Sequence, residues 1–190
     1  MIRYLYFIFI VSTISYSEGV RILFESNSTI SYIGSHPAHD WTGVSNNFNG
    51  GIICNDSSLE ECFIKVVAPL KSFDSKNSGR DSNMLLYTDS NKYPYIKFIS
   101  NEFSISSLLN DTFALSGQLE FHGVKKNIST NVILSKQEDM ILGTAELLLS
   151  LEDYNIERPE LLFIPISDEI RISCKLLCDN KLGLFKNEKK

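Results

Sequence analysis

Apolar and polar residues alternate along most of this chain with the period of two that is typical of a half-buried β-strand. The clearest alternation lies between Asp111 and His122, where apolar and small residues occupy every second position. Helical spacing extends beyond two turns almost nowhere, so the fold class is predicted to be all-β. Strands are expected at 28–35, 41–54, 62–73, from Pro94 onward through Phe98, and at 111–122, 124–134, 140–151 and 166–176.

Short polar or glycine-containing links join most of these segments, which favours pairing of sequence neighbours as hairpins. We therefore expect a single eight-stranded antiparallel up-and-down barrel. The longer link 74–93 predicts one short helix between strands 3 and 4, centred on 81–87 and capped by Asp81 or Ser82. The other long link, 153–165, contains Pro159 and Pro165, so we expect no regular structure there; either long link is a candidate lid over a barrel end.

The first residues have the pattern of an export signal. Arg3 precedes an apolar run at 4–11, and the small residues Ser15 and Ser17 follow at the spacing of a signal-peptidase site. The run is short for a membrane span of ~20 residues, so a retained anchor is the weaker interpretation. We predict a signal peptide at 1–17, one domain at 18–180, a flexible basic tail at 181–190, and a periplasmic or secreted protein.

Charge and cysteine spacing limit which partners and which cysteine chemistry are expected for this protein. The net charge is −5, and the only basic cluster is in the tail, so nucleic acid is not an expected partner. Cys54 and Cys62 flank a polar loop, and in an oxidising compartment they are predicted to form a disulfide across a hairpin. Cys174 and Cys178 would lie ~13 Å apart in an extended strand, beyond the ~7 Å that a disulfide tolerates. Whether these two pair stays open, and a zinc site at the cysteines is disfavoured by their spacing.

The inward faces carry mainly branched and aromatic residues, with small residues such as Gly34, Ala68, Gly117 and Ala145 among them. Eight strands enclose a space that side chains can just fill or that can hold one small ligand. A solid core and an apolar cavity are both compatible with this pattern.

The segment 116–126 resembles the hairpin of the YceI-like, polyisoprenoid-binding, lipocalin-like family, in which a strand ends in His-Gly-Val and a lysine follows; here these are His122, Gly123, Val124 and Lys125. The segments 72–75, 80–84 and 92–100 resemble further family motifs in the same order. The resemblance implies an exported, lipocalin-like eight-stranded barrel that holds a long isoprenoid chain in an apolar interior, without established catalytic activity.

The predicted function is binding, storage or transport of a long apolar lipid, either a polyisoprenoid or an isoprenoid quinone. No cofactor is expected besides that lipid, and the protein is not expected to be an enzyme, because no recognised nucleophile or phosphate-binding motif occurs. Transient membrane contact and a homodimer stay open. The residues predicted to contact the ligand are Ile30, Tyr32, Phe48, Ile64, Val66, Met84, Ile96, Phe98, Phe113, Leu115, Leu119, Phe121, His122, Val132, Leu147 and Ile170.

The same residues are compatible with other roles. His122 would either contact a polar lipid head group or fix the turn before Gly123 by bonding backbone groups. His36 and His39 invite a metal-dependent hydrolase, although the turn between them makes a shared metal improbable. A sealed barrel would instead suit an exported stress or interaction protein.

Overall fold

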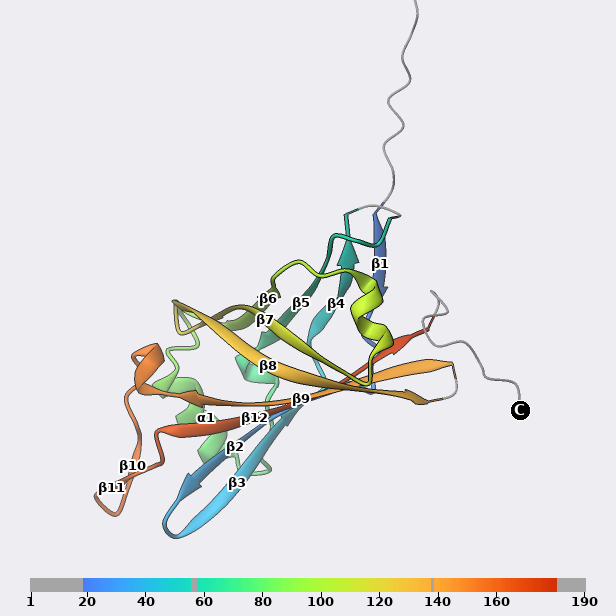
Figure 1. Cartoon of the computed structure of the whole chain (residues 1–190). Helices are drawn as coiled ribbons and strands as arrows, with labels where there is room; N and C mark the ends of the chain where they lie inside the picture. The colour runs from blue at the N-terminus through green and yellow to red at the C-terminus, as the bar shows by residue number, and fades with distance from the viewer. Residues whose placement is uncertain (1–18, 56–57, 138, 181–190) are drawn as a thin grey trace, which may run out of the picture.

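The computed structural model describes residues 19–55, 58–137 and 139–180, most of which belong to a strongly curled antiparallel sheet (Figure 1). This part of the chain contains a ten-stranded sheet in the order β1-β4-β5-β6-β7-β8-β9-β12-β2-β3. Its strands are β1 (Val20–Leu23), β2 (Thr29–His36), β3 (His39–Ser45), β4 (Asn49–Cys54), β5 (Cys62–Pro69), β6 (Tyr95–Ser100), β7 (Thr112–Phe121), β8 (Val124–Gln137), β9 (Met140–Ser150) and β12 (Glu169–Asp179).

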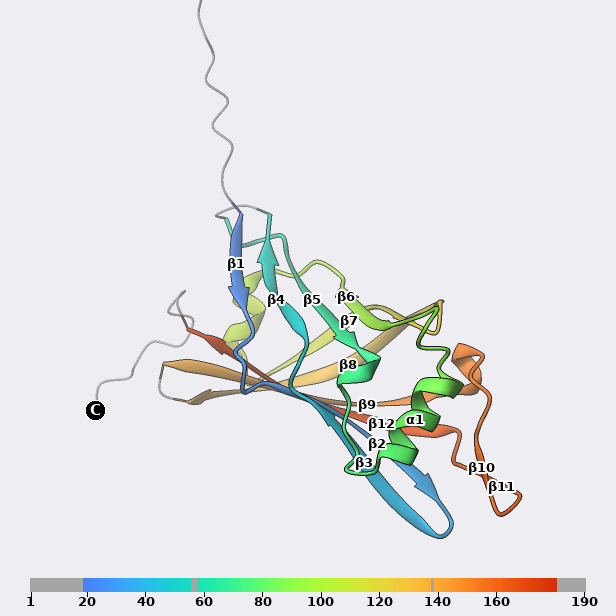
Figure 2. The same cartoon turned by 180° about the vertical axis from the view of Figure 1, so that it is seen from behind.

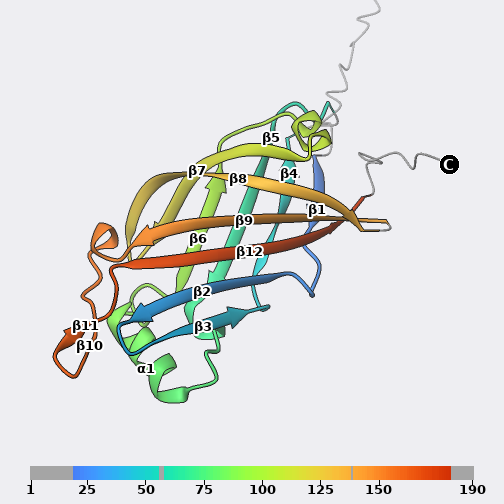
Figure 3. The same ribbon diagram turned by 60° about the horizontal axis from the view of Figure 1, so that its bottom comes forward.

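Alternation along the strands sets which face points inward, as the sequence predicted. In β7 the small Gly117 and the apolar Phe113, Leu115, Leu119 and Phe121 are buried, whereas the residues that alternate with them are exposed or half-buried. Successive side chains of a strand point to opposite faces, so a curled sheet gathers one set of them inside the curl. Figure 3 shows the strands wrapping around this interior. The all-β class is therefore confirmed.

The strand count differs from the expected eight, because one predicted strand is divided and one further strand precedes the first predicted strand. The predicted strand 41–54 is divided into β3 and β4 at residues 46–48, where the Ser45 hydroxyl accepts a hydrogen bond from the Asn47 N–H at 3.2 Å. An additional strand, β1, precedes the predicted strand 28–35. A turn in which the Ser28 N–H donates to the Glu25 carbonyl at 2.9 Å separates β1 from β2.

One helix, α1 (Ser78–Tyr87), lies between β5 and β6 and contains the predicted centre 81–87. It follows the fifth strand rather than the third, because β1 is additional and the predicted strand 41–54 is divided. Its N-cap is Asn77, whose side chain accepts from the Arg80 N–H at 3.0 Å, so the predicted caps Asp81 and Ser82 are wrong. The helix begins one turn earlier than expected, and the Asp81 carboxylate instead accepts from the Ser75 N–H at 3.1 Å.

The remaining short elements lie in the connections. Within the described part of the chain there are three 3-10 helices, namely η1 (Leu70–Ser72), η2 (Ile105–Leu109) and η3 (Glu152–Tyr154). The link 153–165, expected to lack regular structure, contains a small hairpin of β10 (Glu160–Leu161) and β11 (Ile164–Pro165). Pro159 lies just before β10 and Pro165 is the last residue of β11, positions where a missing N–H disturbs little of the ladder. The hairpin projects from the same end as α1 and the β2–β3 turn (Figures 1 and 2).

The predicted disulfide between Cys54 and Cys62 is confirmed. The two residues pair across β4 and β5 and are almost completely buried, at 1% and 0% exposure. They belong to an apolar cluster with Ile52, Ile105 and Leu108, so η2 covers this end of the sheet. Cys174 and Cys178 have free thiols.

The predicted signal peptide, 1–17, and the predicted tail, 181–190, lie outside the described residues. Among residues 19–55, 58–137 and 139–180, no helix combines the length and the apolar character needed to cross a membrane.

Candidate ligand-binding cavity

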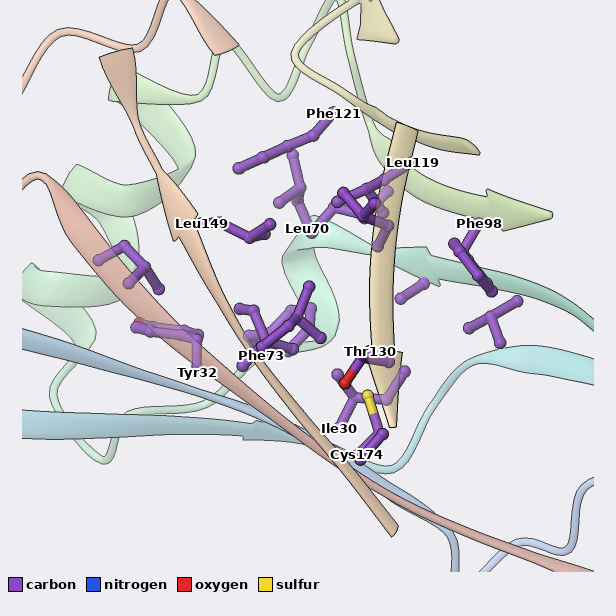
Figure 4. A pocket seen from close by; sticks show the side chains of 18 of the residues that line it. Ile30, Tyr32, Leu70, Phe73, Phe98, Leu119, Phe121, Thr130, Leu149 and Cys174 are labelled. Carbon is purple, nitrogen blue, oxygen red and sulfur yellow. The ribbon is translucent and has the colours of Figure 1, made fainter. Parts of the chain in front are cut away.

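A cavity of about 510 Å³ lies inside the curled sheet. Its size falls within the range of small-molecule sites, roughly 300–1,000 Å³. Inward side chains from most strands of the sheet line it, and α1 contributes one side (Figure 4). Leu70 and Phe73, which follow β5, and Leu149 on β9 face the same space.

The interior is hollow rather than filled by interlocking side chains. Val66, Ile96, Phe98 and Leu147 all line the cavity and are only half-buried, even though they lie on the inward face of their strands. Inward residues of a solid core touch neighbours on every side and lose nearly all their exposed surface. Of the two arrangements compatible with the sequence, the structure has the cavity.

Most of the residues predicted to contact a ligand lie together around this cavity. Those that line it are Ile30, Tyr32, Ile64, Val66, Met84, Ile96, Phe98, Phe113, Leu115, Leu119, Phe121, Val132, Leu147 and Ile170. Phe48 and His122 do not line it.

Phe48 lies in the break between β3 and β4, where the alternation that placed it inward no longer holds. Its side chain packs against the buried cluster of Ile30, Ala68 and Phe73 without lining the cavity. The alternation predicted one regular strand over 41–54, and Phe48 lies on the inward face of such a strand. This is why Phe48 was predicted to contact the ligand.

His122 fixes a turn. With Gly123 it forms the two-residue loop between β7 and β8, at φ values of 49° and 74°. Its Nδ1 lies 2.9 Å from the Tyr154 carbonyl oxygen, and its ring meets the edge of Tyr93 with 5.0 Å between centroids. The imidazole thus ties the β7–β8 turn to η3, and of the two roles compatible with the sequence this is the structural one.

The cavity opens at one end of the sheet. Exposed residues contribute to its lining where α1, the β2–β3 turn and β10 meet, namely His39, Asn77, Asn83 and Glu160. At the opposite end, lining residues such as Leu108 and Ile141 are buried. The cavity is therefore an apolar pocket with one polar mouth.

Two buried polar atoms at this mouth have no hydrogen-bond partner among the described residues, the Tyr32 hydroxyl and His36 Nε2. His36 Nδ1 accepts from the Ala38 N–H at 3.1 Å, so in a neutral imidazole Nε2 carries the proton and is a free donor. An unpaired buried donor is costly unless something else binds it. Both residues line the cavity, although these two atoms are themselves shielded from it.

The surroundings keep Tyr32 protonated. Burial raises the pKa of its hydroxyl, and the nearby Asp81 carboxylate raises it further. The Trp41 indole lies beside the hydroxyl without the alignment of a hydrogen bond. Across the hairpin, a Cβ at Gly43 would lie 2.2 Å from the Tyr32 ring, so glycine leaves room for this ring. Arg80 of α1 stacks over Trp41, with 5.4 Å from its guanidinium to the ring centroid.

His36 and His39 do not form a metal centre. The His36 Nδ1 is occupied by the Ala38 N–H, whereas the exposed His39 ring packs near Trp41, with 5.7 Å between centroids. No group of three or more His, Cys, Asp or Glu side chains with the geometry to hold a metal ion occurs within the described part of the chain.

Sequence reasoning missed several lining residues. Leu149 and Ile172 lie in phase with predicted positions on their strands, so a longer count along β9 and β12 would have found them. Leu70 continues the alternation of Ile64, Val66 and Ala68, so the sequence does signal it. Phe73 follows a 3-10 turn, and Arg80 and Asn83 depend on how α1 lies on the sheet, so no local pattern signals these three positions.

Solved structures with the same fold include BcnA of Burkholderia cenocepacia, with a TM-score of 0.69 at 15% identity over 81% of this chain and 98% of that one. A polyisoprenoid binding domain from Saccharophagus degradans, implicated in plant cell wall breakdown, has a TM-score of 0.69 at 17% identity, over 84% and 97%. A YCEI protein of Campylobacter jejuni has a TM-score of 0.51 at 15% identity, over 95% and 91%. At these identities the likeness establishes the fold.

No curated protein matches this chain. The family model described as the YceI-like domain matches residues 23–177. This match covers most of the chain and confirms the resemblance seen in the hairpin 116–126. The chain belongs to the YceI-like family.

Proposed function

We propose that this protein binds a long apolar lipid, a polyisoprenoid or an isoprenoid quinone, inside the cavity and stores or transports it. The observation that carries the proposal is the hollow interior of about 510 Å³ with its apolar lining. The fold is similar to that of a polyisoprenoid binding domain, and this similarity supports the same class of ligand.

In the proposed arrangement β1 and β2 form one bent strand, and β3 and β4 form another. The ten strands then count as eight, and together they form a continuous wall around the cavity. The Glu25 N–H, in the link between β1 and β2, donates to the Leu177 carbonyl of β12 at 2.8 Å, and Phe24 bridges to Cys178. These contacts support a closed eight-stranded barrel around the ligand.

Apolar contact suffices for binding. Each buried methylene contributes ~0.8 kcal/mol, so a few isoprene units offset an association cost of several kcal/mol without a strong polar contact. Selection among lipids then follows chain length and shape.

The polar mouth adds a preference for the head of the lipid. The unpaired donors of Tyr32 and His36 are buried, so a turn of these side chains toward the cavity would let them bind an acceptor oxygen, as on a quinone carbonyl or a phosphate. The lipid would therefore lie with its chain in the apolar pocket and its head near α1. Catalysis forms no part of this proposal.

The disulfide between Cys54 and Cys62 fits an oxidising compartment. Together with the export signal expected at 1–17, it supports a periplasmic or secreted location.

Organic extraction of the purified protein, followed by mass spectrometry, tests the proposal. We expect an isoprenoid lipid in near-stoichiometric amount, whereas protein purified without detergent that repeatedly yields no lipid, and takes up none when offered it, would contradict storage or transport.

Replacing Leu119 by Trp tests whether the lipid occupies the cavity. Leu119 is 6% exposed and lines the pocket from β7, so the larger ring is expected to fill the ligand space and abolish lipid uptake. Gln118→Trp is the matched control, because the neighbouring Gln118 is exposed and outside the lining. Uptake is measured by extraction, and circular dichroism checks that both variants fold. Undiminished lipid in a folded Leu119→Trp variant would place the lipid elsewhere.

A further inference from the structure

The β10–β11 hairpin ends in an unusually exposed apolar tip. Leu162 is 79% exposed and Phe163 is 96% exposed, and the adjacent Leu161 and Ile164 are exposed at 44% and 46%. These four residues are consecutive, so they form one patch rather than scattered surface positions. Large apolar side chains gathered at a projecting turn indicate a contact outside the molecule.

The backbone conformation of the turn also indicates a contact outside the molecule. Leu162 and Phe163 form the two-residue loop of the hairpin, and both have positive φ, at 53° and 63°. This is the backbone of a type I′ turn, which strongly favours Asn-Gly. The β7–β8 loop uses the same pair of positive φ angles with a glycine, Gly123, in its second position. Leucine and phenylalanine therefore oppose local folding, and their exposed side chains do not compensate by packing against the described residues.

The base of the hairpin is held at the cavity mouth, whereas the tip is not. The Ser167 N–H donates to the Ser35 carbonyl of β2 at 2.8 Å, and the Ile166 N–H donates to the Pro159 carbonyl at 3.0 Å. Glu160 and Leu161 line the cavity itself. Figures 1 and 3 show the hairpin projecting beyond the sheet beside α1 and the β2–β3 turn.

The charge pattern identifies the surface that fits this tip. No charged residue occurs from Leu161 to Ser167, but Glu160 and Asp168 flank the segment. Acidic flanks disfavour attraction to an anionic surface, so the tip is suited to apolar insertion rather than electrostatic docking. An apolar tip enters the boundary between head groups and acyl chains to a depth of ~5–10 Å.

We propose that the tip of the β10–β11 hairpin inserts into a lipid bilayer and so places the cavity mouth at the leaflet where lipid enters or leaves. The exchange of lipid rests on the proposed function, whereas the membrane contact rests on the hairpin alone. Insertion would be shallow and reversible, because only two large side chains are fully presented.

Co-sedimentation with vesicles tests the contact. The variant Leu162→Asn/Phe163→Gly gives the turn its preferred residues and removes the apolar tip, so folding is expected to be retained or improved. Its partition into phosphatidylcholine vesicles is expected to fall by at least about tenfold relative to the unaltered chain. Phosphatidylglycerol mixed into the vesicles in equal amount is expected not to strengthen binding.

Ile133→Ser is the matched control, since Ile133 is 58% exposed on β8 in the half that leads to β9. This variant is expected to bind vesicles like the unaltered chain. Equal vesicle binding by the folded hairpin variant would overturn the inference. A change in self-association instead of vesicle binding, seen by sedimentation velocity, would overturn it in favour of a second copy of this chain.

Loading assays separate this inference from the proposed function. The hairpin variant is expected to take up isoprenoid lipid normally from detergent micelles and at least about tenfold more slowly from vesicles. Normal micelle loading with unchanged vesicle binding would remove the hairpin inference and leave the lipid function standing. Vesicle binding that depends on the tip, in a protein that loads no lipid from either source, would support the membrane contact and remove the proposed function.

Discussion

Cys174 is one of two free cysteines that line the cavity, the other being Cys178. Cys174 lines the pocket from β12, and burial raises the pKa of its thiol to about 11 (Figure 4). The thiol is therefore uncharged at neutral pH and acts as a small apolar group beside Ile30. A nucleophile in this setting is suited to contact with a lipid rather than to covalent chemistry.

Alkylation of Cys174 is expected to be slow and to rise with pH. The thiolate is the reactive form, so at pH 8 a pKa of about 11 leaves on the order of one thiol in a thousand reactive, against about a quarter at an ordinary pKa of ~8.5. The rate with iodoacetamide, followed by mass spectrometry in a Cys178→Ala background, should increase about tenfold per pH unit up to roughly pH 11. Bound lipid should slow it further. A rate that levels off near pH 8.5 would contradict a buried thiol.

At the scale of elements, α1 is a short helix that depends on its context. Ten-residue helices are marginal in isolation, and α1 has no fully buried residue. Its support comes from the Asn77 cap and from Met84 and Leu85, which pack against the apolar cluster around Leu70 and Leu119. The helix thereby holds the polar side of the cavity mouth in place.

Replacing Asn77 by Ala is expected to lower the free energy of unfolding by about 1 kcal/mol, because the Arg80 N–H loses its side-chain acceptor. Urea unfolding followed by circular dichroism measures the change. Ser82→Ala is the matched control, since the exposed Ser82 lies inside α1 and does not cap it. A loss of stability on replacing Ser82, with none on replacing Asn77, would place the cap where the sequence had predicted it.

At the scale of the whole molecule, the two ends of the curled sheet differ. One end is closed by η2, the disulfide and the surrounding buried apolar residues. The other end presents α1, the β2–β3 turn and the β10–β11 hairpin around the cavity mouth. Stability and ligand access are thus concentrated at opposite ends.

Removal of the disulfide by Cys54→Ala/Cys62→Ala is expected to cost roughly 2–3 kcal/mol of unfolding free energy, because the bond closes a short loop of the unfolded chain. Lipid recovery should be unchanged, since neither cysteine lines the pocket. Urea unfolding and lipid extraction on the same preparation measure both quantities. Loss of lipid from a variant that still folds would show that the closed end takes part in binding.

Local sequence pattern was sufficient to predict which faces of the strands point inward and which two cysteines form the disulfide. Alternation along 111–122 identified Phe113, Leu115 and Leu119 as inward, and a strand holds successive side chains on opposite faces whatever lies around it. Cys54 and Cys62 were assigned as partners because a short polar loop between strands brings its two ends together. Both features depend on residues that are close along the chain.

The tertiary structure settled the features that depend on distant residues. The break at 46–48 removed Phe48 from the cavity wall, and the cap of α1 moved to Asn77, because curvature and packing override local pattern. Tyr32, His36 and α1 form the cavity mouth only once the sheet has curled. Alternation tells which side chains point inward, but the distance between opposite walls, and hence whether the interior is solid or hollow, is set by the curvature of the whole sheet.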